Sequence, residues 1–392
     1  MKVFFRSINS CAMRKTDVGK YKNALLETGH EIVGAPEESD VILVWTCAFR
    51  SDFRTHSVNV LNEYQEEFGK RVIACGCLPS IDVEAMREGF KGEYFEWINE
   101  AQAMKDLFGV DLDEAQRPLV EKALDVSIEE FKKDNPQIKT THCDQFIKLF
   151  ISEGCTFGCT YCAELLAFPK YRSFPLKKLI AKCKQAVEES NIYKVVLHGD
   201  LLGEYGKDIG SSFPELVNML KNEIPSIELG IRNLHPVHFL EYLDSFVGWL
   251  KDGTIFLLET PIQSASDLVL KSMARNYTKA DLVKLFDGIK EAGFSEVETH
   301  IIAGFPGETE EQFQETVDFI CQYKPKYVLI SGFMETAKIP ASKFAGKVDE
   351  EVKRKRVLDA HRQISEKGII CNYDFCDFSQ AAVLPRIELM VT

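Results

Sequence analysis

The stretch SEGCTFGCTYCAEL contains three cysteines, Cys155, Cys159 and Cys162, at intervals of four and three residues. Structural zinc sites take four protein ligands, and iron–sulfur clusters also usually take four thiolates. Three thiolates leave one metal position open for a ligand that the protein does not supply. The motif therefore indicates a cubane cluster with a catalytic role. A zinc loop and coincident core cysteines are the alternatives.

A second set of cysteines follows the strand-like segments of residues 1–108. The runs KVFFRSI, DVILVWTC and RVIACGC predict strands, and the stretches between them predict helices. Alternating strands and helices imply a parallel sheet, in which the carboxyl ends of the strands meet at one edge. Cys11 lies just past the first strand, and Cys47 and Cys77 lie at the ends of the next two. We expect these three thiols to converge in an N-terminal open parallel α/β domain.

The rest of the chain predicts a connector and a second α/β domain. Residues 109–143 are acidic and helix-rich, which is typical of a connector. In residues 144–367, five or six strand-like runs alternate with amphipathic helices, which predicts a partial (β/α)6 barrel of the TIM type. Polar residues follow each strand, where such a barrel places its active site. Cys155 comes just after the first of these strands.

The composition limits the class of protein. The chain has 392 residues, 45% of them hydrophobic, and no apolar run long enough to span a membrane. Its N-terminus lacks a signal-peptide pattern, so a cytoplasmic protein is expected. Twelve cysteines in a reducing compartment indicate metal binding or catalysis. The net charge of −13 lowers the expectation of a large nucleic-acid surface.

Several segments resemble the radical S-adenosylmethionine (SAM) methylthiotransferases, over about residues 1–365. Cys-x3-Cys-x2-Cys with an aromatic residue before the last cysteine is similar to the radical SAM motif. NSCAMRKTD, VWTCAFR and ACGCLPS stand in the order of the family's three N-terminal cysteine motifs. RSFPLKKLI, VVLHGDLLGEYGKD, TPIQSASDLVLKSMARNYT and HIIAGFPGETEEQF resemble its later segments.

The resemblance implies two 4Fe–4S clusters and SAM as cofactors. Cys155, Cys159 and Cys162, hereafter the loop cysteines, would bind the cluster whose open iron chelates SAM. The second set would bind a cluster that holds the sulfur to be transferred. One SAM methylates that sulfur, and a second is cleaved reductively to a 5′-deoxyadenosyl radical that removes hydrogen from an unactivated C–H bond. The carbon radical takes up the methylthio group, and a flavodoxin or ferredoxin supplies electrons.

The resemblance also places residues around SAM: Tyr161, Arg172, His198, Gly199, Asp200, Gln263, Ile302 and Gly304. Gly199 and Asp200 stand where the superfamily binds the methionine amino group. Arg172 matches an arginine that faces the carboxylate, with a solvated surface arginine as the alternative. His198 either binds the cofactor or is a structural histidine.

Other positions near strand ends receive weaker assignments. Ile302 and Gly304 fall where related barrels contact adenine. Gln263 and Ser264 lie at a strand end and are expected to face substrate or ribose. The segment FPGE, residues 305–308, is interpreted as a structural strand-to-helix turn.

The choice of ligand in RVIACGC follows the family pattern, which favours Cys77 over Cys75. Cys75 lies two residues earlier on the same strand face and remains the alternative. Cys371 and Cys376 are spaced too loosely to indicate a metal site. Three isolated cysteines are interpreted as buried apolar-like residues: Cys143, Cys183 and Cys321.

Three departures from the family bear on the acceptor. Residues 368–392 form a short tail in place of the usual C-terminal TRAM domain, and AELLAFPKY after Cys162 lacks the family's Arg-Gly pair. Glu259 and Ala265 replace a histidine and a glycine. Because phosphate contacts supply most nucleic-acid affinity, these changes favour a peptide, protein or natural-product acceptor, as in RiPP modification. A tRNA adenosine is the alternative.

Two other functions would use the same motifs. A radical SAM enzyme whose auxiliary cluster only relays electrons would catalyse peptide crosslinking or dehydrogenation, and its product would gain no methylthio group. An iron–sulfur redox module would release no 5′-deoxyadenosine from SAM.

Overall fold

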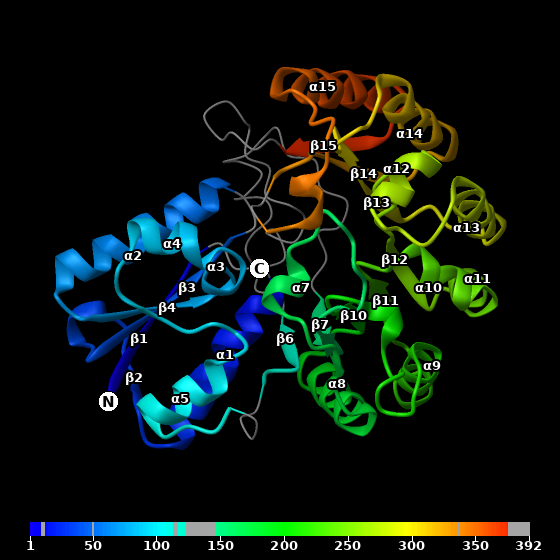
Figure 1. Ribbon diagram of the computed structural model, residues 1–392. Coiled ribbons are helices and arrows are strands. Elements are labelled where there is room, and N and C mark those ends of the chain that lie inside the picture. The colour runs from blue at the N-terminus through cyan, green and yellow to red at the C-terminus, as the bar shows by residue number, and fades with distance from the viewer. Residues whose placement is uncertain (9–11, 49–50, 113–116, 123–145, 336–337, 375–392) are drawn as a thin grey trace. The chain divides into compact units, whose positions relative to one another are not determined.

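The computed structural model describes residues 1–8, 12–48, 51–112, 117–122, 146–335 and 338–374 (Figure 1). The chain divides into two compact units. Unit 1 comprises Met1–Pro118, Ala163–Lys170 and Thr336–Ile339, and unit 2 comprises Leu119–Cys162, Tyr171–Glu335 and Pro340–Thr392. No helix in the described ranges has the length and apolar character needed to cross a membrane.

Unit 1 is built on a five-stranded parallel sheet in the order β2-β1-β3-β4-β5. Its strands are β1 (Lys2–Ser7), β2 (Glu31–Ile32), β3 (Val41–Thr46), β4 (Arg71–Gly76) and β5 (Glu93–Tyr94). Its helices are α1 (Ala12–Glu27), α2 (Ser51–Phe68), α3 (Cys77–Ile81), α4 (Val83–Gly89), α5 (Glu100–Phe108) and α7 (Glu164–Ala167). The three strands that the sequence predicts form the centre of this sheet.

Helices cover both faces of the unit 1 sheet because alternate strand residues point to opposite sides. Leu43, Trp45 and Cys75 face a core that includes α1 and α5. Val44 and Ala74 face a second core that includes α2, α3 and α4. Figure 1 shows these two helical layers with the strands between them. Burial on both faces explains why VILVWT is a continuous apolar run.

The first helix differs from its predicted form. The run of residues 17–30 predicts a helix capped by Asp17, whereas α1 begins at Ala12 and includes Asp17. Asp17 is buried and pairs with Arg14 at 2.9 Å and with Arg117 at 2.5 Å. The capping prediction is wrong, because the helix begins five residues earlier and the carboxylate pairs with two buried arginines instead.

Unit 2 is a partial barrel whose sheet has the order β15-β14-β13-β12-β11-β10-β7-β6. The strands are β6 (Val120–Lys122), β7 (Ile147–Phe150), β10 (Lys194–His198), β11 (Glu228–Ile231), β12 (Ile255–Glu259), β13 (Val297–Ala303), β14 (Tyr327–Gly332) and β15 (Ile370–Asp374). A separate two-stranded ribbon pairs β8 (Ser152–Glu153) with β9 (Arg172–Ser173). From β7 to β15 all neighbours are parallel, and β6 is antiparallel to β7.

Helices surround the outside of this curved sheet (Figure 1). They are α8 (Leu176–Ser190), α9 (Phe213–Glu223), α10 (Pro236–Glu241), α11 (Leu243–Lys251), α12 (Asp267–Ser272), α13 (Lys279–Glu291), α14 (Glu310–Tyr323) and α15 (Glu350–Glu366). Side chains from four strands, including Val196, Phe256 and Leu329, form an apolar cluster with Phe146. The predicted α/β fold, a parallel N-terminal domain followed by a partial parallel barrel, is confirmed.

The segment that follows Cys162 packs within unit 1. Phe168 is buried in the core that contains α2, α3 and α4. The guanidinium of Arg14 lies 3.5 Å from the Phe168 ring centroid, and the Trp97 ring lies 5.6 Å from it. The family's basic residues are therefore replaced here by apolar packing. The domain ranges predicted from the sequence stay predictions, and of the predicted tail only residues 368–374 are described.

The FPGE segment forms a tight turn between β13 and α14. Gly307 has φ +83°, a conformation that favours glycine. The buried carboxylate of Glu308 accepts a hydrogen bond from the Gly304 backbone N–H at 2.6 Å and pairs with Arg356 at 3.2 Å. Burial raises the pKa of Glu308 to about 7, although Gly304 and Arg356 act in the opposite direction and Glu310 adds to the rise. This geometry agrees with a structural role.

Replacing Glu308 by Gln is expected to flatten the pH dependence of stability. The pKa of Glu308 is about 7 in the folded chain, above its usual value of 4.5, so its proton stabilises the folded state below pH 4.5. That stabilisation is lost as the pH rises toward 7. In urea unfolding from pH 4.5 to 8, the free energy of unfolding of the parent should fall by about 3 kcal/mol relative to that of Glu308→Gln. Parallel curves would contradict the assignment.

Candidate functional site

The loop cysteines follow β8 in a segment of little regular structure, and each is partly exposed. The backbone N–H of Phe157 lies 3.4 Å from Cys155 Sγ. In the described ranges, no three His, Cys, Asp or Glu side chains gather around a single metal ion. A cubane binds its thiolates through different irons, so it needs a wider set of sulfur positions. Three accessible thiols with a backbone donor fit such a cluster.

The start of the loop is attached to the end of β10. The Asp200 carboxylate accepts a hydrogen bond from the Gly154 backbone N–H at 2.7 Å. Gly199 lies so close to β8 that a Cβ atom would be 2.5 Å from Ser152 Oγ. Asp200 is thus placed beside the loop, and part of its carboxylate is occupied by the backbone there. Gly199 permits the close approach.

Arg172 lies on β9, opposite Glu153 on β8. Its guanidinium forms an ion pair with Glu153 at 2.5 Å, and its side chain is 50% exposed whereas that of Glu153 is 8% exposed. Arg172 is therefore both anchored next to the cysteine loop and accessible to a solute carboxylate. Its predicted contact with SAM stays a prediction.

The end of the loop is attached to the segment after α12. The Thr160 hydroxyl donates to Ser272 O at 2.8 Å, and its backbone N–H donates to Met273 O at 3.1 Å. Arg275 Nη1 lies 3.6 Å from Cys159 Sγ and 3.1 Å from the Tyr161 hydroxyl. Burial raises the pKa of Tyr161 well above its usual value, so its hydroxyl stays protonated. The sequence motif MARNYT contains Arg275, but its spacing alone did not indicate this contact.

His198 ends β10 and is 6% exposed. Its ring lies 5.4 Å from that of Phe150, and its Nε2 has no hydrogen-bond partner among the described residues. Desolvation, together with the charges of Arg232 and Lys148, holds the pKa of His198 well below its usual value. A neutral buried histidine with an unused ring nitrogen is suited to bind a polar ligand. This favours the ligand hypothesis over a satisfied structural histidine.

The remaining predicted residues lie around β13. Gln263 has φ +62° and pairs through its backbone with His300 O at 2.8 Å and Ile302 N at 2.9 Å, and both Gln263 and Ile302 are partly exposed. Ser264 is fully buried with its hydroxyl 3.2 Å from Thr316 Oγ1, which disagrees with the expectation that it faces a ligand. At Gly304, a Cβ would be 2.1 Å from Lys353 Cγ, so helix packing also requires that glycine.

A network of buried charged groups joins residues of β12 and β13 to Arg232, which follows β11. Glu259 is fully buried, with one oxygen 3.0 Å from Arg232 Nη1 and the other 3.1 Å from His300 Nε2. Glu298 lies 3.6 Å from the same Arg232 nitrogen. Glu259 is one of the departures from the family that bear on the acceptor, because it stands in place of a histidine. Its carboxylate is buried and paired with residues of neighbouring strands, so it adds no exposed negative charge.

Two members of the second cysteine set, Cys47 and Cys77, lie at one edge of the unit 1 sheet. Thr46 and Gly76 are paired across β3 and β4, so Cys47 and Cys77, the next residues in the chain, are neighbours at this edge. Both are partly exposed, whereas Cys75 is 1% exposed in the core.

Gly76 separates the environments of Cys75 and Cys77. Its φ of +86° turns the chain, and a Cβ there would lie 2.7 Å from Thr46 O. The two cysteines therefore pack on opposite sides of the sheet, and the expectation of one shared face is wrong. This supports Cys77 as the ligand. Cys11 lies outside the described residues.

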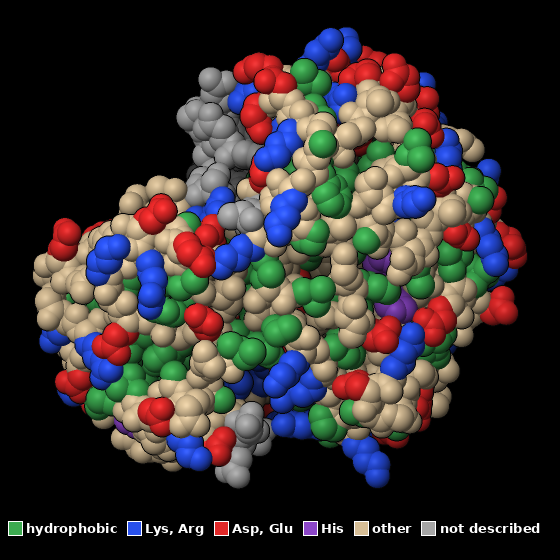
Figure 2. Space-filling view, viewed as in Figure 1, with side chains coloured by type: hydrophobic (Ala, Val, Ile, Leu, Met, Phe, Trp, Pro, Cys, Tyr) green, Lys and Arg blue, Asp and Glu red, His purple; other side chains and the backbone are tan. Residues whose placement is uncertain are grey.

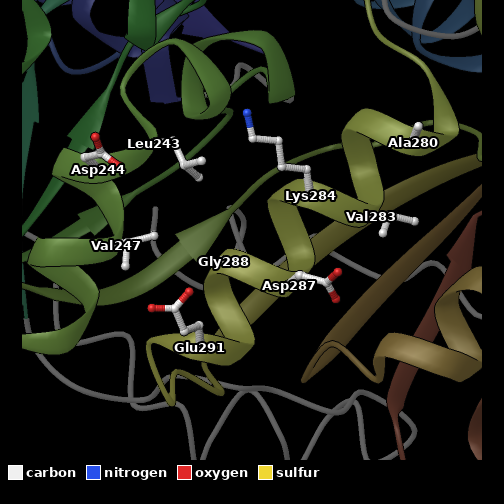
Figure 3. A pocket seen from close by; sticks show the side chains of 9 residues that line it. All are labelled: Leu243, Asp244, Val247, Ala280, Val283, Lys284, Asp287, Gly288 and Glu291. Atoms are coloured by element: carbon white, nitrogen blue, oxygen red, sulfur yellow. The ribbon is translucent and has the colours of Figure 1, made fainter.

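A surface groove of about 490 Å³ lies elsewhere, between α11 and α13. Figure 3 shows Leu243 and Val247 on one helix and Lys284 and Glu291 on the other. None of the predicted site residues lines it. Sequence reasoning also missed an aromatic contact of the cysteine loop, in which the Phe157 ring lies 4.2 Å from that of His235.

Comparison with known structures identifies the class. A radical SAM methyltransferase, TsrM from Kitasatospora setae, superposes with a TM-score of 0.62 at 14% identity, covering 87% of this chain and 75% of that chain. The cobalamin-dependent SAM radical enzyme OxsB gives a TM-score of 0.54 at 11% identity over 93% of this chain and 56% of that chain. Residues 149–320 match the radical SAM superfamily. The fold and the cysteine loop define a radical SAM protein.

Sequence comparison narrows the class to a family. Residues 2–95 match Uncharacterized protein family UPF0004. A probable threonylcarbamoyladenosine tRNA methylthiotransferase of Pyrococcus horikoshii is 30% identical, over 82% of this chain and 75% of the relative. The threonylcarbamoyladenosine tRNA methylthiotransferase of Mus musculus is 30% identical over 90% of this chain, which spans only 61% of that relative's length; for Homo sapiens the share is 60%. The chain belongs to the radical SAM methylthiotransferase family.

Membership of this family implies SAM and two 4Fe–4S clusters as cofactors. When bound, a reduced cluster of this kind supplies the electron that cleaves SAM. The residues of this chain that suit the task are thiols to hold the cluster, Asp200 to fix the loop, and the anchored Arg172 to meet an anionic group.

Replacing Gly199 by Ala is expected to destabilise the barrel by about 1–3 kcal/mol, because the new Cβ would overlap Ser152 Oγ. Removing that oxygen in Ser152→Ala/Gly199→Ala should restore part of the loss. Gly248→Ala is the control. Gly248 lies in α11, and a Cβ built there would have no atom within 4 Å, so this variant should not be destabilised. Urea unfolding measures all four proteins. Equal losses in the single and double variants would contradict the contact.

Replacing Cys77 by Ala is expected to remove one of two clusters, whereas Cys75→Ala should keep both. The physical reason is that Cys77 is accessible at the strand edge and Cys75 is enclosed in the core. Iron and acid-labile sulfide per chain, measured after anaerobic reconstitution, distinguish the variants. Loss of iron from Cys75→Ala with retention in Cys77→Ala would reverse the assignment.

Proposed function

We propose that this protein is a methylthiotransferase that acts on tRNA carrying threonylcarbamoyladenosine. The observation that carries the proposal is the 30% identity to enzymes so named in an archaeon and in mammals, over 82% to 90% of this chain. The loop cysteines and the second set provide thiols for the two clusters that the reaction needs. A small reducing protein of the flavodoxin or ferredoxin type is the proposed electron donor.

The hypothesis of a peptide or natural-product acceptor receives no support from the relatives. Its structural basis is also weak. Glu259 is paired with Arg232 inside the barrel, and the segment after Cys162 is an apolar packing element. Neither departure therefore creates an acidic surface that would repel a polyanion.

The exposed face of α8 is compatible with an RNA partner. Its lysines at 177, 178, 182 and 184 are all exposed, and Lys184 forms an ion pair with Glu223 at 3.2 Å. Acidic residues appear in this helix only at Glu188 and Glu189. Figure 2 shows Lys and Arg side chains around the position that α8 has in Figure 1. Neutralising phosphates with such side chains supplies much of RNA affinity. A local basic surface of this kind can operate on a chain whose net charge is −13.

The chain's own residues have separate tasks in this proposal. Asp200 and Gly199 hold the start of the cysteine loop against the barrel. His198, neutral and with an unused nitrogen, offers a hydrogen bond to a polar group of SAM. The reaction requires that water and other C–H bonds be kept from the site, because a carbon radical attacks any nearby C–H bond.

The deciding experiment supplies the reconstituted, reduced protein with SAM and three acceptors. These are tRNA bearing threonylcarbamoyladenosine, the same tRNA without that modification, and a mixture of peptides. Mass spectrometry of digested nucleosides should show a methylthio group replacing hydrogen only with the first acceptor. Formation of 5′-deoxyadenosine without sulfur transfer to any tRNA would overturn the proposed substrate. Absence of 5′-deoxyadenosine would overturn the reaction class.

A further inference from the structure

Arg275 is a buried cation next to a predicted cluster ligand. It is 8% exposed, and its guanidinium has four contacts within unit 2. Nε donates to the Tyr277 hydroxyl at 2.8 Å, and Nη2 donates to Pro261 O at 2.8 Å. Nη1 donates to the Tyr161 hydroxyl at 3.1 Å and lies 3.6 Å from Cys159 Sγ. The planar guanidinium is therefore fixed in orientation, with one N–H group directed at the sulfur.

The backbone conformation before Arg275 sets the direction in which its side chain leaves the helix end. Ala274 has φ +55°, a left-handed conformation that costs about 1 kcal/mol for a residue with a side chain. Backbone hydrogen bonds from Ala274 N to Lys271 O at 3.1 Å and from Arg275 N to Leu270 O at 2.9 Å close the end of α12. This left-handed ending of the helix fixes the point at which Arg275 leaves α12.

Tyr277 also holds the Arg275 guanidinium in place. Its hydroxyl accepts from Arg275 Nε and donates to Ile262 O at 2.7 Å. The contacts with Pro261 and Ile262 connect the arginine to the segment that follows β12. Arg275 thus joins the barrel wall to the cysteine loop through hydrogen bonds of defined direction. A role limited to filling space would not need a charged group here, because burying an arginine is costly unless it is fully paired.

A permanent positive charge and an N–H donor change the electronics of a thiolate-bound cluster. The reduction potential of iron–sulfur clusters depends on net charge and on hydrogen bonds to the sulfurs. A cation near the sulfur stabilises the reduced, more negative state, and the interaction is stronger away from water. The reduced state is the one that cleaves SAM.

We propose that Arg275 is a positioning residue that donates a hydrogen bond to the thiolate of Cys159 and raises the reduction potential of the cluster held by the loop cysteines. The proposal rests on the proposed function only in that the loop binds a cluster. Three features of Arg275 contribute to this effect on the potential: its charge, its N–H contact with the sulfur and its fixed orientation. None of them requires the acceptor to be known.

The test is a redox titration of the full chain, reconstituted anaerobically and followed by electron paramagnetic resonance. The signal to follow is that of the reduced cluster whose spectrum changes when SAM is added, which separates it from the second cluster. Arg275→Gln keeps a side chain of similar reach but removes the charge. It should retain a folded structure by circular dichroism and shift the potential of this signal to a more negative value.

Arg356→Gln is the matched control. Arg356 is also a buried arginine of unit 2, but it pairs with Glu308 and Glu310. Its replacement should lower stability and leave the potential of the SAM-sensitive signal as in the parent. A negative shift in Arg275→Gln but not in Arg356→Gln supports the proposal. An unchanged potential in folded, fully loaded Arg275→Gln overturns it.

Arg275→Lys keeps the proposal testable if the Gln variant does not fold. Lysine retains the charge but lacks the planar fork that holds Tyr161, Pro261 and Cys159 together, so the sulfur contact should be lost and the potential should again fall. An unchanged potential in Arg275→Lys overturns the hydrogen-bond role. A parent protein with no SAM-sensitive signal would contradict the proposed function instead, and this outcome is distinct from either variant result.

Discussion

The candidate site depends on the contacts by which neighbouring segments hold the cysteine loop in its conformation. Between β8 and α7 the chain forms few regular hydrogen bonds of its own, so its thiols are placed by neighbouring segments. Asp200 holds Gly154 at one end, and Ser272 and Met273 hold Thr160 at the other. Each anchor is a group at or beyond the carboxyl end of a strand or helix. Parallel strand order brings those ends together, which is why this architecture can support an otherwise irregular loop.

Close approach of backbones is the second requirement. Gly199 allows the end of β10 to contact Ser152, and Gly76 allows the end of β4 to contact Thr46. In both places a methyl group would overlap an oxygen atom. The two cysteine sets, one in each unit, thus use the same physical device next to a strand end. At Ala274 the backbone is also left-handed, but there a residue with a side chain accepts the strain.

Charge is organised by pairing inside unit 2. Glu259, Glu298, Arg232 and His300 form one network among the strand ends, and Glu308 with Arg356 forms another. Buried charges of this kind are tolerated only with partners, so their presence says little about the surface that meets a substrate. Exposed side chains decide that surface, and the lysines of α8 show that an acidic chain can carry a local basic one.

The sequence by itself determined the fold class and the metal chemistry. The hydrophobic periods of strands and helices are local properties of the chain, so these elements could be predicted without coordinates. The spacing of Cys155, Cys159 and Cys162 is also local, so the cluster motif could be recognised in the same way. The resemblance already favoured Cys77 over Cys75, and the turn at Gly76 adds a physical reason, because it places the two thiols on opposite sides of the sheet.

Long-range contacts were decided only by the tertiary structure. Arg275 meets Cys159 across 116 residues of chain, Glu259 meets Arg232 from an adjacent strand, and Ser264 is enclosed against Thr316 from α14. No local pattern specifies which distant group a side chain will face. A polar residue near a strand end has the same sequence signature whether it points to a ligand or to a buried partner, and only the packing of the completed barrel separates the two.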